Sequence, residues 1–194
     1  MIALVLALTL SQADGGVAAE AVPAPDAFRT QWDRERTTVN GGGMWVLGGW
    51  AALNIGSGII GAAVTPNEQW RFFHLGNAVW NGVNLALAIV GLINNYREKP
   101  GVSAKEALIG SQRSVAVFFI NAGLDVAYLA TAAFLWQRGD ATGDARLVGL
   151  GQSLLVQGGW LLVFDTVMGA LNLSLTNRLL DHVTVTPLGV SGSF

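Results

Sequence analysis

The chain has 194 residues, of which 52% are apolar and only 12% are charged, and its formal net charge is −2. Soluble domains carry about 25% charged residues, so this composition favours a membrane protein. The small net charge without a basic stripe argues against nucleic acid as a partner, and the absence of cysteine excludes disulfides, iron–sulfur clusters and thiolate zinc sites.

The first residues have the composition of an export signal. Residues 1–10 form an apolar run that is too short to cross a bilayer, and residues 17–19 fit an A-x-A-like cleavage site. We therefore predict a signal peptide over residues 1–19. No Lys or Arg precedes the run, so a misplaced start codon or a non-cleaved anchor is the alternative explanation. Residues 20–42 are predicted to be a juxtamembrane segment, either a short interfacial helix or a solvated lead-in.

Four apolar segments follow, at residues 43–64, 72–93, 114–136 and 147–173, and none of them contains Lys, Arg or Glu. Each is long enough to cross about 30 Å of hydrocarbon as a helix. The pattern predicts an all-α fold, a four-helix transmembrane bundle with short loops, followed by a polar C-terminal tail at residues 174–194. Residues 103–106, Ser-Ala-Lys-Glu, predict a capping box before the third span.

The membrane orientation has two conflicting signals. Four spans place both termini on one side, which then carries eight of the Lys and Arg residues against three on the other. The positive-inside rule therefore favours cytoplasmic termini, whereas a cleaved signal peptide favours exported termini. We favour exported termini, because an export signal acts on the chain before the spans that follow it.

Each span has one Asn or Asp near its middle: Asn54, Asn84, Asp125 and Asp165. Residues 50–61 also align without gaps with residues 80–91, with Trp, Asn and Gly at matching places. This is either a genuine internal repeat or convergence, since helices rich in small residues resemble one another.

The second span carries its polar residues on one helical face. His74, Asn77, Asn81 and Asn84 follow one another at spacings of three, four and three residues. A stripe of Asn facing lipid would be costly, so this face is predicted to point into the bundle.

Asp125 and Asp165 are the two residues with acidic side chains within the predicted spans, where such side chains are rare. An ionised carboxylate at the centre of a bilayer costs about 2.5–3.5 kcal/mol on insertion scales, and every Lys and Arg lies at or beyond a span end. Four arrangements can relieve that cost. Both carboxyls can carry protons, the pair can share one proton, Asn amides can donate hydrogen bonds to them, or they can bind a cation or cationic ligand.

The residues predicted to bind a ligand or ion are therefore polar groups of the span interiors, with one histidine at a span end. They are Asp125, Asp165, Asn54, Asn84, Asn77, Asn81, Asn121 and His74. The plainer interpretation of the amides is hydrogen bonding between helices, and that of the two Asp residues is a neutral structural carboxyl. His74 is either an interfacial histidine or a proton entry point. Trp80 is expected to pack or to hydrogen-bond through its indole N–H, with a stacked ligand as the alternative. Tyr128 can donate to Asp125, and helix packing explains it equally well.

Three stretches carry a resemblance to a known family: FFHLGNAVWNGVNLALAIVGL (72–92), NAGLDVAYLATAAFL (121–135) and GQSLLVQGGWLLVFDTVMG (151–169). They resemble an uncharacterised family of bacterial four-span membrane proteins, a domain of unknown function, over roughly residues 45–180. The polar pattern HxxNxxW of that family is present as His74, Asn77 and Trp80. The resemblance implies a multi-pass protein, often with an export signal, and implies no activity.

Together these observations predict an integral protein of the bacterial inner membrane that binds or conducts a proton, an ion or a small polar ligand in a polar interior. The alternative is a structural or assembly protein whose interior polar groups only specify helix packing. An enzyme is the weakest hypothesis, because no Ser-His pairing, histidine cluster or HExxH, GxGxxG or Walker A motif is present. No catalytic residue, metal or cofactor is therefore predicted, and the lipid bilayer is the expected partner.

Overall fold

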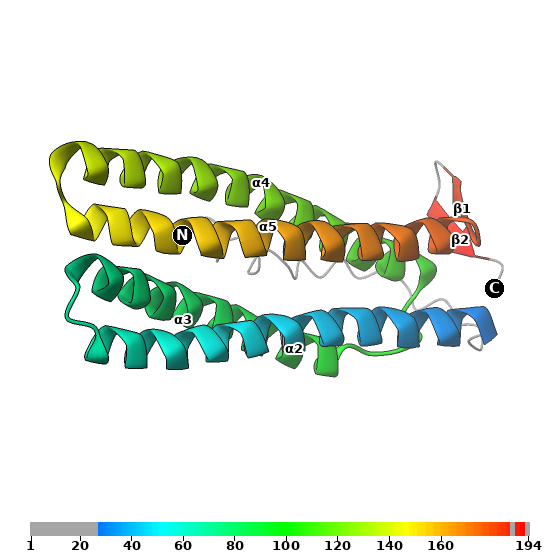
Figure 1. Ribbon diagram of the computed structural model, residues 1–194. Helices are drawn as coiled ribbons and strands as arrows, with labels where there is room; N and C mark the ends of the chain where they lie inside the picture. The colour runs from blue at the N-terminus through cyan, green and yellow to red at the C-terminus, as the bar shows by residue number, and fades with distance from the viewer. Residues whose placement is uncertain (1–26, 187–188, 193–194) are drawn as a thin grey trace.

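The computed structural model describes residues 27–186 and 189–192. In this part of the chain four long helices lie side by side (Figure 1): α2 (Ala27–Val64), α3 (Glu68–Arg97), α4 (Ala104–Thr142) and α5 (Ala145–Leu180). Each of them is long and apolar enough to cross a membrane. The expected helical fold with four apolar helices is therefore confirmed, whereas the predicted signal peptide lies outside the described residues.

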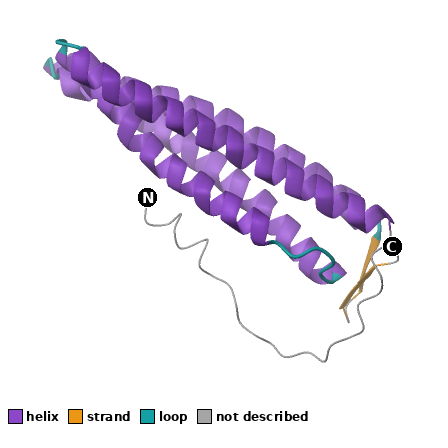
Figure 2. Cartoon of the chain, turned by 90° about the horizontal axis from the view of Figure 1, so that it is seen from below, coloured by secondary structure: helices purple, strands orange, loops and turns teal. Residues whose placement is uncertain are grey.

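Two short strands follow the last helix, β1 (Val183–Thr186) and β2 (Gly189–Gly192), and they pair antiparallel. The sequence analysis predicted only a polar tail over residues 174–194. Instead, α5 continues to Leu180, because Leu175 and Leu179 are buried against the neighbouring helices, and the hairpin comes after it. Figure 2 shows the hairpin at one end of the elongated bundle.

The helix ends are defined by local hydrogen bonds. Asn67 and Asp144 cap α3 and α5 by accepting from backbone N–H groups of the first turn. Ser103 and Glu106 form the predicted capping box at the start of α4. Gly143 ends α4 with φ +68°, a left-handed conformation that favours glycine. These caps keep the three connections between the helices short.

The helices extend beyond the predicted spans, mainly at the end of the bundle where α2 begins and α5 ends (Figure 1). Helix α2 has 38 residues, about 57 Å at 1.5 Å per residue, which is nearly twice the hydrocarbon thickness of about 30 Å. Residues 27–42 are thus the first turns of α2 and not a separate interfacial helix. We call this charged part of the bundle, formed by residues 27–42, 98–113 and 174–186, the terminal end.

Trp32 organises a hydrophobic core within the terminal end. Its side chain is fully buried against Leu108, Leu175 and Leu179. The indole Nε1–H donates to the carbonyl oxygen of Leu175 at 2.8 Å, and the guanidinium of Arg36 lies 5.0 Å from the ring centroid. This contact joins the first turns of α2 to the last turns of α5, which explains why both helices continue so far.

The helix pairs differ in how closely their backbones pack. Helices α2 and α3 form one hairpin and α4 and α5 another, and α5 also packs against α3 and α2. The backbones of α3 and α4 do not pack closely against each other in the described residues. Side chains and cavities therefore occupy the space between these two helices.

Glycines allow the closest approaches between helices. A Cβ atom at position 149 of α5 would overlap the carbonyl oxygen of Gln69 in α3. A Cβ atom at position 151 would lie 2.7 Å from the backbone nitrogen of Trp136 in α4. Small residues of this kind let helix backbones meet where no hydrophobic driving force acts between helices.

Candidate functional site

The amides of the predicted polar interior form a connected group around Gln157. We call the side chains of Asn54, Asn77, Asn81, Asn84, Ser153 and Gln157 the amide cluster. Gln157 accepts hydrogen bonds at Oε1 from Trp50 Nε1 and Asn81 Nδ2, both at 3.0 Å. Its Nε2 donates to Asn54 Oδ1 at 3.2 Å and to Asn77 Oδ1 at 2.9 Å. One side chain of α5 is thereby joined to both α2 and α3.

The remaining members complete the amide cluster. Ser153 Oγ donates to Asn77 Oδ1 at 2.8 Å, and Asn84 Nδ2 donates to Asn81 Oδ1 at 3.2 Å. Within the described residues, every buried side-chain nitrogen and oxygen of the amide cluster has a hydrogen-bond partner. The amide cluster is saturated in the sense that none of its fully buried atoms is unpaired, which is the arrangement expected of polar groups that specify helix packing.

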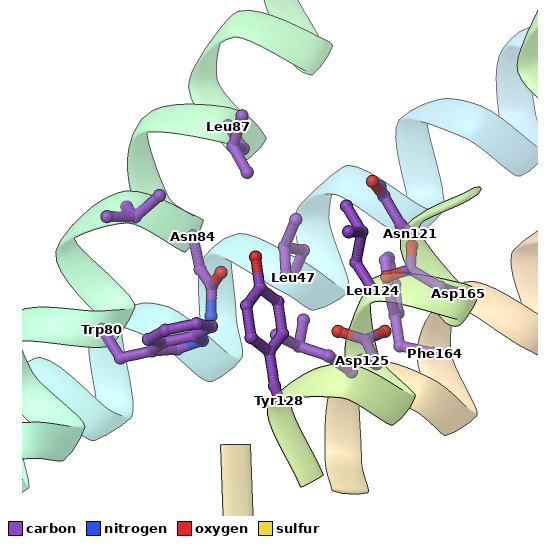
Figure 3. A pocket seen from close by; sticks show the side chains of 12 residues that line it. Leu47, Trp80, Asn84, Leu87, Asn121, Leu124, Asp125, Tyr128, Phe164 and Asp165 are labelled. Carbon is purple, nitrogen blue, oxygen red and sulfur yellow. The ribbon is translucent and has the colours of Figure 1, made fainter. Parts of the chain in front are cut away.

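Asp125 and Asp165 lie on the opposite helical hairpin and are both buried, with 3% and 6% of their surfaces exposed. Figure 3 shows the two carboxyl groups and the amide of Asn121 close together, and the carboxyls are near enough to influence each other electrostatically. An ionised carboxylate can only accept a hydrogen bond, so a hydrogen bond between two carboxyls requires one of them to carry a proton. Of the four arrangements considered from the sequence, neighbouring carboxyls beside an amide are what a shared proton needs.

A cavity of about 140 Å³ adjoins this carboxyl pair, and all four helices contribute to its lining. We call it the polar cavity. Figure 3 shows Asn84 and Trp80 of α3 on one side of it, Asn121, Asp125 and Tyr128 of α4 on the other, with Leu47 of α2 and Asp165 of α5 completing the lining. The ring of Tyr128 meets the ring of Trp80 edge-on, with 4.8 Å between the centroids. The polar cavity therefore lies in the space that α3 and α4 leave between them.

Two fully buried polar atoms of the lining residues have no hydrogen-bond partner. They are Asp125 Oδ2, a hydrogen-bond acceptor, and Trp80 Nε1–H, a donor. Buried polar groups in proteins are nearly always paired, so each exception needs an explanation. Here both exceptions belong to residues that line one cavity, in contrast to the saturated amide cluster beside it.

The structure thus divides the eight predicted residues into three groups. Asp125, Asp165 and Asn121 gather at the polar cavity. Asn54, Asn77 and Asn81 belong to the amide cluster, and Asn84 belongs to both. His74 does not line the polar cavity; its ring contacts Phe73 edge-on at 5.4 Å between the centroids.

Ser153 was not among the residues predicted from the sequence. It lies four residues before Gln157, on the same helical face, and that spacing is a signal which could have identified it. Trp80 was expected to pack or to hydrogen-bond through its indole N–H; it packs, and the N–H has no partner. The side chain of Tyr128 packs against Trp80, and no hydrogen bond from Tyr128 to Asp125 is seen in the described residues.

All the residues that line the polar cavity fall between residues 47 and 165. The Family of unknown function (DUF6992) matches residues 46–166 of the chain. The chain belongs to this family. The match includes the polar cavity and the amide cluster in full, and it confirms the family of unknown function expected from the sequence. No curated protein and no solved structure matches the chain.

Proposed function

We propose that this member of the family is an integral membrane protein that binds a small polar ligand at the carboxyl pair Asp125–Asp165. The observation that carries the proposal is the unpaired acceptor of Asp125 together with the unpaired donor of Trp80 at one cavity. An unpaired buried polar atom costs about 1–3 kcal/mol, and a bound molecule that pairs with both atoms would recover this energy. A proton or a small cation at the carboxyl pair is the simplest form of the same site.

The size of the polar cavity limits the ligand. A cavity of about 150 Å³ holds a molecule as large as benzene, whereas binding sites for drug-sized ligands measure about 300–1,000 Å³. With a volume of about 140 Å³, the polar cavity fits a group of about six non-hydrogen atoms. A small head group or a few waters with an ion match this volume.

The alternative function, in which interior polar groups only specify helix packing, explains the amide cluster and not the polar cavity. The saturation of the amide cluster supports a packing role for Asn54, Asn77, Asn81 and Gln157. Amide side chains also do not exchange protons readily, so this network is a poor proton relay. We therefore assign helix packing to the amide cluster and ligand binding to the polar cavity.

We further propose that the protein lies in the inner membrane of a bacterium, with exported termini. The four apolar helices support a membrane location, and the family resemblance and the signal-like first residues support the rest. Fusion of a periplasmic reporter to the C-terminus tests the orientation. Activity of that reporter supports exported termini, and activity of a cytoplasmic reporter at the same place contradicts them.

Replacing Asp125 by asparagine is expected to leave the protein folded and to weaken ligand binding. The amide that Asp125→Asn introduces can donate to Asp165 as a protonated carboxyl does, but the pair can no longer share a proton, and an amide oxygen is a weaker acceptor than a carboxylate oxygen. We expect the free energy of unfolding to change by less than about 1 kcal/mol. Infrared spectroscopy should show the band of a protonated carboxyl in the natural protein and lose it in the variant.

Binding is measured by the thermal shift of the purified protein with glycerol, ethylammonium and sodium ions as probes, over a range of pH values. We expect at least one probe to raise the melting temperature of the natural protein and to raise that of Asp125→Asn by less. Equal shifts in both proteins, or no shift with any probe, would contradict the proposed site. A variant that fails to fold would favour a purely structural role for Asp125, and Asp165→Asn then provides an independent test of the same pair.

A further inference from the structure

A second cavity lies beside the polar cavity, on the side toward the start of α3. It measures about 380 Å³ and is lined almost entirely by apolar side chains, among them Phe72, Leu75 and Val79 of α3, Leu135 of α4 and Leu150 of α5. We call it the apolar groove. Trp80 lines both cavities, so the polar cavity and the apolar groove meet at this residue.

The apolar groove opens toward the surface of the bundle. Its lining residue Val79 is 74% exposed and Leu75 is 37% exposed, and the backbones of α3 and α4 do not close over the space between them. Residues 72–80 and 135 belong to the apolar stretches of two helices that are able to cross a membrane. In a bilayer the groove therefore faces acyl chains and not water.

We propose that the polar cavity and the apolar groove bind one single-chain amphiphile from the bilayer, with a hydroxyl-bearing head in the polar cavity and its chain in the apolar groove. This inference rests on the ligand site proposed above and adds the class of ligand and its route of entry, laterally between α3 and α4. From Phe72 to Trp80 the groove follows α3 for about 12 Å, which is room for an extended hydrocarbon chain.

The two unpaired atoms determine the chemistry of the head. One hydroxyl of the head can donate to Asp125 Oδ2, and a second hydroxyl can accept from Trp80 Nε1–H. An alkylammonium has no lone pair for the indole, and an ionised fatty acid has no proton for the carboxyl oxygen. Figure 3 shows Tyr128 between Trp80 and Asp125, so a head with more than one hydroxyl, such as the glycerol of a monoacylglycerol, reaches both sides of the polar cavity best.

Photo-crosslinking tests this inference on the full chain in lipid nanodiscs. The probe is a monoacylglycerol with a diazirine in its chain, and peptide mapping locates the label. We expect the label on the groove residues Leu75, Val79 and Leu135, and we expect unlabelled monoacylglycerol to compete for it. A fatty acid or an alkylamine of the same chain length should compete at least about tenfold less well, because each leaves one buried group unpaired.

Leu135→Trp fills the apolar groove and should reduce the labelling at least about tenfold. Phe134→Trp is the matched control, since Phe134 is the neighbouring residue on α4, is 64% exposed and does not line the groove. We expect normal labelling in this control. If Leu135→Trp fails to fold, Leu75→Trp fills the groove from α3 and is tested in the same way.

The outcomes separate this inference from the proposed function. A label spread evenly over the lipid-facing residues, or an alkylamine that competes better than the monoacylglycerol, would overturn the inference. A thermal shift with glycerol would still support the polar cavity as a ligand site in that case. Conversely, Leu135→Trp should keep the glycerol shift while it loses the label, because glycerol has no chain to place in the groove.

Discussion

Replacing Gln157 by methionine is expected to lower the free energy of unfolding by about 2–3 kcal/mol. Gln157 makes four hydrogen bonds, to Trp50, Asn54, Asn77 and Asn81, and hydrogen bonds between membrane helices average about 0.6 kcal/mol each. Methionine has a similar length and flexibility, so the loss reports the hydrogen bonds and not the packing volume.

Unfolding in mixed micelles by titration with a denaturing detergent, followed by circular dichroism, measures this loss. Gln152→Met is the control on the same helix, because Gln152 makes a single side-chain hydrogen bond, from Gln69 at 3.0 Å. Its cost should stay below about 1 kcal/mol. Equal costs for the two variants would mean that the amide cluster does not hold α5 against α2 and α3.

A loss of stability of up to about 2 kcal/mol is expected when Gly149 is replaced by alanine. The new Cβ atom would overlap the carbonyl oxygen of Gln69 and would lie 2.9 Å from the backbone nitrogen of Phe73. Backbone atoms cannot rotate out of the way, so α3 and α5 must separate, and overpacking of this kind typically costs about 1–3 kcal/mol. The effect opposes the gain of about 1 kcal/mol that alanine usually brings over glycine within a helix.

Gly159→Ala provides the control for this substitution. Gly159 lies on the same helix, and a Cβ atom at its position would meet nothing within 4 Å. We expect no loss of stability, or a gain of up to about 1 kcal/mol. The same detergent titration measures both variants, and a neutral Gly149→Ala would show that α3 and α5 are not held together at this crossing.

The fold could be predicted where the apolar runs are long and uninterrupted. The four spans are visible as such runs, and the capping box at Ser103 and Glu106 indicates the beginning of α4. The full lengths of α2 and α5 could not be predicted. The turns around Trp32 and Leu179 carry charged residues, and they are helical because these two side chains meet in one core, which is a tertiary contact.

The site could be predicted as a set of residues but not as an arrangement. Trp50 with Asn54 and Trp80 with Asn84 occupy equivalent places in the aligned segments, so the sequence treats the two indoles alike. In the structure, Trp50 donates to Gln157 whereas the indole N–H of Trp80 has no partner. The difference arises from neighbours on other helices, which no pattern within one span contains.

The pairing of Asp125 with Asp165 has the same cause. The absence of a cation in every span restricts how the carboxyls can be accommodated, but the sequence leaves their mutual distance open. The packing register of α4 against α5 brings them together, and it depends on close contacts such as that of Gly151 with the backbone at Trp136. Small residues far from the carboxyls thus contribute to the site through the helix positions.

In the proposed membrane location, α2 and α5 extend beyond the hydrocarbon, so that single helices lie in two solvents. Around Trp32 and Leu179 their neighbours are water and a buried apolar core, where the hydrophobic effect stabilises packing and urea weakens it. Around Gln157 and Gly149 the surroundings are hydrocarbon, in which that driving force between helices is absent. Urea should therefore weaken the packing around Trp32 while the hydrogen bonds of the amide cluster remain. Helices α2 and α5 would then lose their packing in two stages, first around Trp32 and later around Gln157.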